Sequence, residues 1–354
     1  MKLISALSLV AFLVAATPSV AQSDGRPECR REVVQLCGPT RDRRELKACL
    51  AAKSADLSPA CKEKIAGRLE VVRATEQGAR PPRASEGVEL EYGSDSKQNL
   101  DFYPARAQPS PPLIVFIHGG GWMVGDKSTG AGNKPSLYNG LGYAFASVNY
   151  RLIPSDRAGT NTNLTPADQA HDVANAIAFL RTNAARLGFD PNQIILMGHS
   201  AGAHLVALVS TQAKYLTDAG VPSKSVRGAI LLDGAGYDVP SQLAFIVANG
   251  RSKQRAEKIY SQVFGDDPAT HRNLSPVTFA SETNTDNWLI LYVARREDSR
   301  IQSETLGAKL ANAKATVSVR AIEDSTHESV NRDAGEKGTL VGDLIVGFLA
   351  TLKP

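Results

Sequence analysis

The stretch Ile194-Ile195-Leu196-Met197-Gly198-His199-Ser200-Ala201-Gly202 decides the expected fold. Its apolar start is typical of a buried strand, and the small and apolar residues from Ser200 to Thr211 indicate a helix. The turn between them would be too tight for side chains at 198 and 202, which explains the two glycines. Such a turn lifts the Ser200 hydroxyl out of the sheet at a helix N-terminus, where free N–H groups favour negative charge.

Strand-like and helical segments alternate from Val88 onward. Strands are also expected at Val88–Tyr92, Asn99–Tyr103, Leu113–Ile117, Tyr143–Asn149, Ala229–Leu232, Leu289–Val293 and Thr316–Ile322, and helices after Pro166 and at Ile301–Ala311 and Leu340–Leu349. The continuous apolar runs are typical of strands buried on both faces. The alternation predicts an α/β fold with a mainly parallel sheet covered on both faces, in which the first two strands form an antiparallel edge.

A second motif, His118-Gly119-Gly120-Gly121-Trp122, follows the strand expected at Leu113–Ile117. Acyl transfer develops an oxyanion, and backbone N–H donors stabilise it at little reorganisation cost. We expect Gly119 and Gly120 to supply these donors together with the N–H of Ala201. The run lacks the Gly-Lys-Ser/Thr of a phosphate loop. Trp122 lines the substrate pocket or packs in the core, and the sequence leaves both roles open.

A serine hydroxyl needs a positioned base, and a histidine base needs an orienting carboxylate. Of the six histidines, His327 follows the expected strand Thr316–Ile322 in a polar stretch, so we place it on a loop at the carboxyl edge of the sheet. Asp298 follows Leu289–Val293 at the same edge and is the expected acid. Glu297 beside it, and Asp233 after another buried strand, are the alternatives.

From about residue 88 to 354 the chain resembles the α/β-hydrolase superfamily, in particular hormone-sensitive-lipase-like carboxylesterases, bacterial feruloyl-esterase-like proteins and kynurenine formamidases. The matching segments are His118–Trp122, Asn149–Leu152, Leu187–Pro191 and Gly198–Leu205. The resemblance implies a nucleophile at Ser200, an acid at Asp298, a base at His327 and oxyanion glycines at Gly119 and Gly120. The polar loop Ile153–Thr165 and the cysteine-containing N-terminus depart from lipase-like relatives, so fold and triad do not name the substrate.

The N-terminus has the pattern of an export signal. Lys2 precedes an apolar run, Leu3–Ala16, and small residues follow at Ser19 and Ala21. This pattern predicts a signal peptide over residues 1–21 and a periplasmic or secreted protein. The apolar run is short for a spanning helix, and no later stretch is apolar enough for one, so no stable membrane span is expected.

The four cysteines, Cys29, Cys37, Cys49 and Cys61, all lie in the N-terminal part of the chain. An even count behind an export signal favours two disulfides, and the spacing lacks the close pairs of a structural zinc site. Several pairings are open; a helical hairpin would place Cys37 and Cys49 at its turn and leave Cys29 and Cys61 to close the outside. The pattern resembles the cysteine-rich repeat of a Golgi glycoprotein family. We expect a cysteine-rich helical module at 22–75, a linker at 76–87 and a catalytic domain at 88–354.

Composition sets few further limits. The 354 residues are 42% hydrophobic and 21% charged, with a formal net charge of +4, so no nucleic-acid partner is indicated. We expect an exported serine hydrolase that cleaves a small-molecule or polysaccharide-linked carboxylic ester without a metal or organic cofactor. The alternatives are an amidase or arylformamidase with the same triad, and a non-catalytic binding protein on a hydrolase fold. The cysteine-rich module is a candidate for protein or surface contact.

Overall fold

The computed structural model describes residues 26–38, 49–50, 52–59, 61–62, 87–105, 110–154, 163–249 and 260–352. These residues divide between two compact units, one within residues 1–71 and one within 72–354. The expected signal peptide, nearly all of the expected linker and the middle of the 153–165 loop lie outside the described residues. None of the described helices combines the length and the apolar character that crossing a membrane requires.

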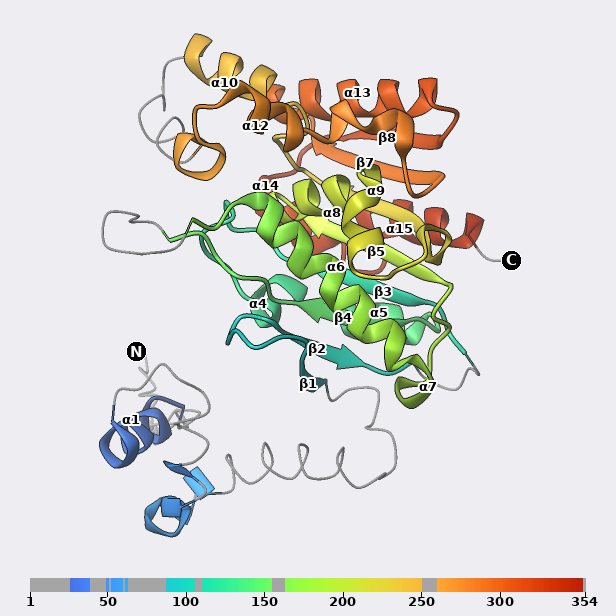
Figure 1. The fold of residues 1–354 in the computed structure, drawn as a ribbon. Coiled ribbons are helices and arrows are strands. Elements are labelled where there is room, and N and C mark those ends of the chain that lie inside the picture. Colours follow the sequence, from blue (N-terminus) through green and yellow to red (C-terminus); the bar gives the residue numbers. More distant parts are fainter. Residues whose placement is uncertain are drawn as a thin grey trace, which may run out of the picture. The chain divides into compact units, whose positions relative to one another are not determined.

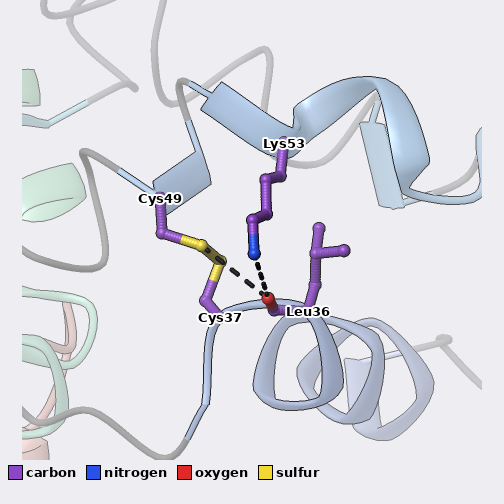
Figure 2. Close-up of a disulfide and its surroundings, with 4 residues drawn as sticks. All are labelled: Leu36, Cys37, Cys49 and Lys53. Carbon is purple, nitrogen blue, oxygen red and sulfur yellow. Dashed lines mark hydrogen bonds between the residues drawn. A yellow bond between two sulfur atoms is a disulfide. The ribbon is translucent and has the colours of Figure 1, made fainter.

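The smaller unit is helical and held by a disulfide. Helix α1 (Arg26–Cys37) ends at a cysteine that is bonded to Cys49, and a short turn, η1 (Ser54–Asp56), follows (Figure 2). The Nζ of Lys53 also donates to the carbonyl of Leu36, at 3.5 Å. The sequence left the pairing open, and the bond between Cys37 and Cys49 agrees with the alternative in which these two cysteines flank a helical turn. Cys61 is disulfide-bonded too, whereas the side chain of Cys29 lies outside the described part.

The larger unit is built on an eight-stranded sheet with the order β1-β2-β4-β3-β5-β6-β7-β8 (Figure 1). Its strands are β1 (Val88–Glu91), β2 (Asn99–Tyr103), β3 (Leu113–Ile117), β4 (Ala144–Val148), β5 (Ile194–His199), β6 (Val226–Leu232), β7 (Asn287–Val293) and β8 (Thr316–Ile322). β1 and β2 pair antiparallel at one edge, and every pairing from β4 to β8 is parallel. The expected sheet with its antiparallel edge is confirmed.

Alternate residues of the central strands point to opposite sides of the sheet, and both sets are buried. Helices therefore cover both faces. One face packs against α6 (Pro166–Thr182), α8 (Ala201–Thr211) and α13 (Glu297–Asn312), and the other against α4 (Lys127–Ala131), α5 (Lys134–Gly140), α14 (His327–Asp333) and α15 (Leu340–Thr351). Shorter elements complete the unit: α7 (Ala184–Leu187), α9 (Ala213–Asp218), η2 (Ser223–Ser225), α10 (Val239–Ala248), α12 (Pro268–Asn273), η3 (Pro276–Thr278) and η4 (Ala280–Glu282). The strands β3 and β4 are buried along their whole length, as their apolar runs predict.

The turn from β5 into α8 leaves no room for side chains at its two glycines. A Cβ at Gly202 would lie 2.2 Å from the carbonyl oxygen of Ile117 in β3, and a Cβ at Gly198 would lie 2.3 Å from the carbonyl oxygen of Gly202. Both obstacles are backbone atoms, which cannot rotate away. The close contact between α8 and β3 therefore depends on glycine at these positions.

We predict that Gly202→Ala lowers the free energy of unfolding by about 1–3 kcal/mol, because the added methyl overpacks the contact with β3. Gly347→Ala is the matched control: Gly347 lies in α15, and a Cβ there would meet nothing within 4 Å. The control should gain about 0.5–1 kcal/mol from helix propensity. Urea unfolding followed by circular dichroism measures both, and an unchanged midpoint for Gly202→Ala would contradict the prediction.

Candidate active site

Ser200 occupies the turn between β5 and α8 in a strained backbone conformation. Its φ is 55° and its ψ is −122°, a region that residues with side chains rarely adopt. The Ser200 N–H donates to the carbonyl of Leu232 at the end of β6, at 3.0 Å. This turn presents the hydroxyl at the carboxyl edge of the sheet, at the N-terminus of α8.

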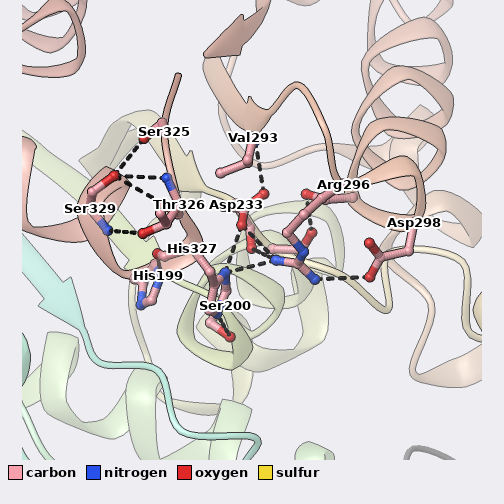
Figure 3. Close-up of polar contacts among 12 residues, drawn as sticks. His199, Ser200, Asp233, Val293, Arg296, Asp298, Ser325, Thr326, His327 and Ser329 are labelled. Carbon is pink, nitrogen blue, oxygen red and sulfur yellow. Dashed lines mark hydrogen bonds and ion pairs between the residues drawn. The ribbon is translucent and has the colours of Figure 1, made fainter. Parts of the chain in front are cut away.

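Ser200, His327 and Asp233 form a continuous chain of side-chain contacts (Figure 3). His327 Nε2 lies 2.9 Å from the Ser200 Oγ, and His327 Nδ1 lies 2.6 Å from the Asp233 Oδ2. Asp233 directly follows β6, whereas His327 is the first residue of α14 instead of a loop residue as expected. The helix begins there because the Thr326 side chain caps it by accepting from the N–H of Ser329. The arrangement suits proton transfer from the hydroxyl to the ring.

The structure places Asp298 away from the position expected for it. Asp298 lies in the first turn of α13, and its carboxylate accepts a hydrogen bond from the NH2 group of Arg296 at 2.8 Å. No contact of Asp298 with His327 is present in the described part. Asp298 does not reach the ring because the chain runs on past the end of β7 into α13, with Arg296 between the carboxylate and the ring. Glu297, the neighbouring alternative, is exposed and pairs with Arg300 at 3.7 Å.

The environment of Asp233 keeps it ionised. Its side chain is fully buried, which by itself would raise the pKa of the carboxyl group. Hydrogen bonds from His327 and from the Val293 N–H, together with the charge of Arg296, outweigh burial and lower the pKa of Asp233 well below its ordinary value. The ring of His327 therefore faces a carboxylate at neutral pH.

The glycine loop after β3 packs directly against Ser200. A Cβ at Gly119 would lie 2.9 Å from the Ser200 Cβ, and Gly120, whose φ is 130°, would place a Cβ 1.9 Å from the carbonyl oxygen of Val124. In the described part of the chain, the N–H groups of Gly119, Gly120 and Ala201 donate to no acceptor. These donors beside the hydroxyl can bind an oxyanion.

A cleft of about 320 Å³ opens beside Ser200. It is lined by Gly119, Gly120, Gly121, Thr129, Gly130, His199, Ser200, His327 and Asn331. The loop that forms one wall is held by Tyr150, whose hydroxyl donates to the carbonyl of His118 at 2.9 Å and whose ring stacks on the His118 ring. The lining is therefore mostly backbone and small polar side chains.

The side chain of Trp122 packs in the core. Its side chain is 4% exposed and belongs to the core cluster, not to the lining of this cleft. The indole N–H donates to His204 Nδ1 at 3.2 Å, and the ring lies edge-on to Phe264 with centroids 5.0 Å apart. Trp122 thus anchors the end of the glycine motif in the core.

Sequence reasoning missed two residues that contact His327. His199 Nε2 lies 2.8 Å from the His327 carbonyl oxygen, and burial lowers the pKa of His199 to about 3, so the neutral ring donates this hydrogen bond. The NH1 group of Arg296 lies 2.7 Å from His327 Nδ1. The only sequence signal for Arg296 was an arginine pair, Arg295-Arg296, directly after a buried strand and before two acidic residues.

A family model described as BD-FAE matches residues 100–310. The chain is also 36% identical over 117 residues to a protein of Oryza sativa subsp. japonica named probable isoprenylcysteine alpha-carbonyl methylesterase ICME, a match that covers 33% of this chain and 26% of the relative. Esterase LipC of Mycobacterium tuberculosis is 32% identical over 124 residues, which cover 34% of this chain and 29% of the relative. The chain thus matches less than a third of the length of either relative.

Solved structures resemble this one over most of its length. The carboxylesterase EstE1, described as thermophilic and cloned from a metagenomic library, superposes with a TM-score of 0.60 at 20% identity, covering 85% of this chain and 99% of EstE1. Esterase B from Lactobacillus rhamnosis has a TM-score of 0.58 at 18% identity, covering 86% and 95%. At such identities the likeness is one of fold. Because the BD-FAE model spans more than half of the chain, the protein belongs to the BD-FAE family, on the α/β-hydrolase fold of these esterases.

Proposed function

We propose that this protein is an exported serine hydrolase that cleaves carboxylic esters through an acyl-enzyme. Ser200 is the nucleophile, His327 the general base and Asp233 the carboxylate that orients the base. The N–H groups of Gly119, Gly120 and Ala201 form the oxyanion hole. The esterase names of the relatives support the choice of an ester bond, although each match covers only part of the relative.

One observation carries the proposal: a serine hydroxyl, an imidazole and a buried carboxylate stand in hydrogen-bonding succession beside unpaired backbone donors. A surface serine would need none of these neighbours. The strain at Ser200 supports the same conclusion, since a backbone held at φ 55° costs free energy that the fold must supply.

The geometry supports the following sequence of steps. Ser200 Oγ attacks the ester carbonyl while His327 Nε2 takes its proton, and Asp233 stabilises the imidazolium through Nδ1. The carbonyl oxygen becomes an oxyanion held by the backbone donors. His327 then gives the proton to the leaving alcohol. Water, activated by the same ring, attacks the acyl-enzyme and releases the acid and free Ser200.

Ser200→Ala should lower kcat/KM on a short acyl p-nitrophenyl ester by about 10³- to 10⁶-fold, because the attacking oxygen is lost. Ser94→Ala is the control, since Ser94 is exposed and outside the site. Steady-state kinetics on both variants, with circular dichroism to check folding, tests the nucleophile. Near-full activity in a folded Ser200→Ala variant would overturn it.

The identity of the acid is tested by comparing two isosteric substitutions. Asp233→Asn should lower kcat by about 10³- to 10⁴-fold, because an amide neither holds the productive tautomer of His327 nor balances its charge. Asp298→Asn should keep kcat at its optimum pH within about tenfold of the wild type. The opposite ranking would restore Asp298 as the acid and remove Asp233 from the mechanism.

The bond that is cleaved is tested with a substrate panel. p-Nitrophenyl esters of rising acyl length, a feruloyl ester and N-formylkynurenine are to be compared by kcat/KM. The proposal expects hydrolysis of at least one ester above the rate with the amide-type substrate. Preference for N-formylkynurenine would favour an arylformamidase, and hydrolysis of none of them would favour a non-catalytic binding protein.

Export is tested by mass. When the full chain is produced in a bacterium with a periplasm, the periplasmic protein should begin at residue 22, because Ala21 ends the expected cleavage site. The residues 1–21 are absent from such a product. A protein recovered intact in the cytoplasm would contradict export.

A further inference from the structure

Arg296 lies between the carboxylates of Asp233 and Asp298 and also contacts the ring of His327 (Figure 3). Its NH1 group lies 2.5 Å from the Asp233 Oδ2 and 2.7 Å from His327 Nδ1, and its NH2 group lies 2.8 Å from the Asp298 Oδ2. The Arg296 side chain is 29% exposed, so water screens its charge only in part. A cation thus touches the same ring nitrogen that the proposed acid orients.

The two contacts at His327 Nδ1 exclude one another as hydrogen bonds. With a hydrogen on Nδ1, the ring donates to Asp233 and leaves Nε2 free to accept the proton of Ser200. With a lone pair on Nδ1, the ring accepts from Arg296, and the hydrogen then sits on Nε2, where it blocks that transfer. Arg296 therefore favours the neutral ring and competes with Asp233 for the same nitrogen.

We infer that Arg296 is a positioning residue that opposes protonation of His327, and that Asp298 moderates its charge. This inference rests on the proposed function. A cation beside the ring disfavours the imidazolium. A neutral ring that keeps its hydrogen on Nδ1, toward Asp233, can still accept the proton of Ser200 at Nε2. Asp298, the residue that the sequence suggested as the acid, acts on the ring only through Arg296.

Arg296 keeps its charge throughout the range of an assay. Burial by itself would favour the neutral guanidinium, but the two carboxylates outweigh it and raise the pKa of Arg296. Three further ionisable groups lie near the ring without contacting its nitrogens, and burial lowers the pKa of one of them, Lys134, to about 7. His199 is neutral, and Glu328 on α14 is exposed to water; Lys134, from α5, contacts Asn331 and Gly130 instead of the ring.

The first test is the pH dependence of kcat/KM, whose acidic limb reports the essential base of the free enzyme. Arg296→Gln removes the charge and keeps a hydrogen-bond donor. We expect its acidic limb to move to higher pH by about one unit. Arg296→Lys restores the charge but not the planar fork of donors, so its limb should lie closer to the wild type than that of Arg296→Gln. A limb that stays in place in Arg296→Gln, or that moves equally in Arg296→Lys, overturns the inference.

Asp298→Asn supplies a second test of opposite sign. Without its partner carboxylate, the charge of Arg296 is less balanced, so the acidic limb should move to lower pH. Movement to higher pH, or none, contradicts the inference. This variant also decides the matter alone if thermal unfolding shows that Arg296→Gln does not fold. Failure here leaves the dependence on Ser200 intact, whereas failure of the proposed function appears as a wild type without ester hydrolysis or a fully active Ser200→Ala.

Discussion

Parallel pairing from β3 to β8 is the constraint on which the site depends, because it brings the carboxyl ends of all these strands to one edge of the sheet. The glycine loop follows β3, the nucleophile turn follows β5, Asp233 follows β6, and His327 follows β8. None of these segments is near another in the sequence. The sheet supplies their proximity, and local turns then aim each group.

The electrostatics of the site follow from that crowding. A carboxylate as deeply buried as Asp233 is costly unless it is paired and hydrogen-bonded. The Val293 N–H, the ring of His327 and the guanidinium of Arg296 satisfy it together. The same guanidinium that stabilises the carboxylate also lies 2.7 Å from Nδ1 of the ring.

Most of the larger unit could be predicted from the sequence, because buried parallel strands leave continuous apolar runs such as Leu113–Ile117. The contact of Ser200 with His327 was also accessible, since both follow strands that the sequence predicts, β5 and β8. The choice between Asp233 and Asp298 was not, because both follow neighbouring strands and the sequence does not record the direction in which the chain leaves a strand. Asp233 turns back at once, with a φ of 45°, whereas Asp298 is carried on into α13.

Asp233 is positioned by a strand of the sheet, whereas the proposed base, His327, is positioned by a helix. Asp233 follows β6, which pairs with β5 up to the partners His199 and Leu232. The separation of the proposed nucleophile and acid is thus fixed by the spacing of hydrogen-bonded strands, about 4.8 Å. His327, by contrast, is placed by the first turn of a seven-residue helix beyond β8. The sheet therefore places the proposed nucleophile and acid relative to each other, whereas the placement of the base depends on how α14 packs.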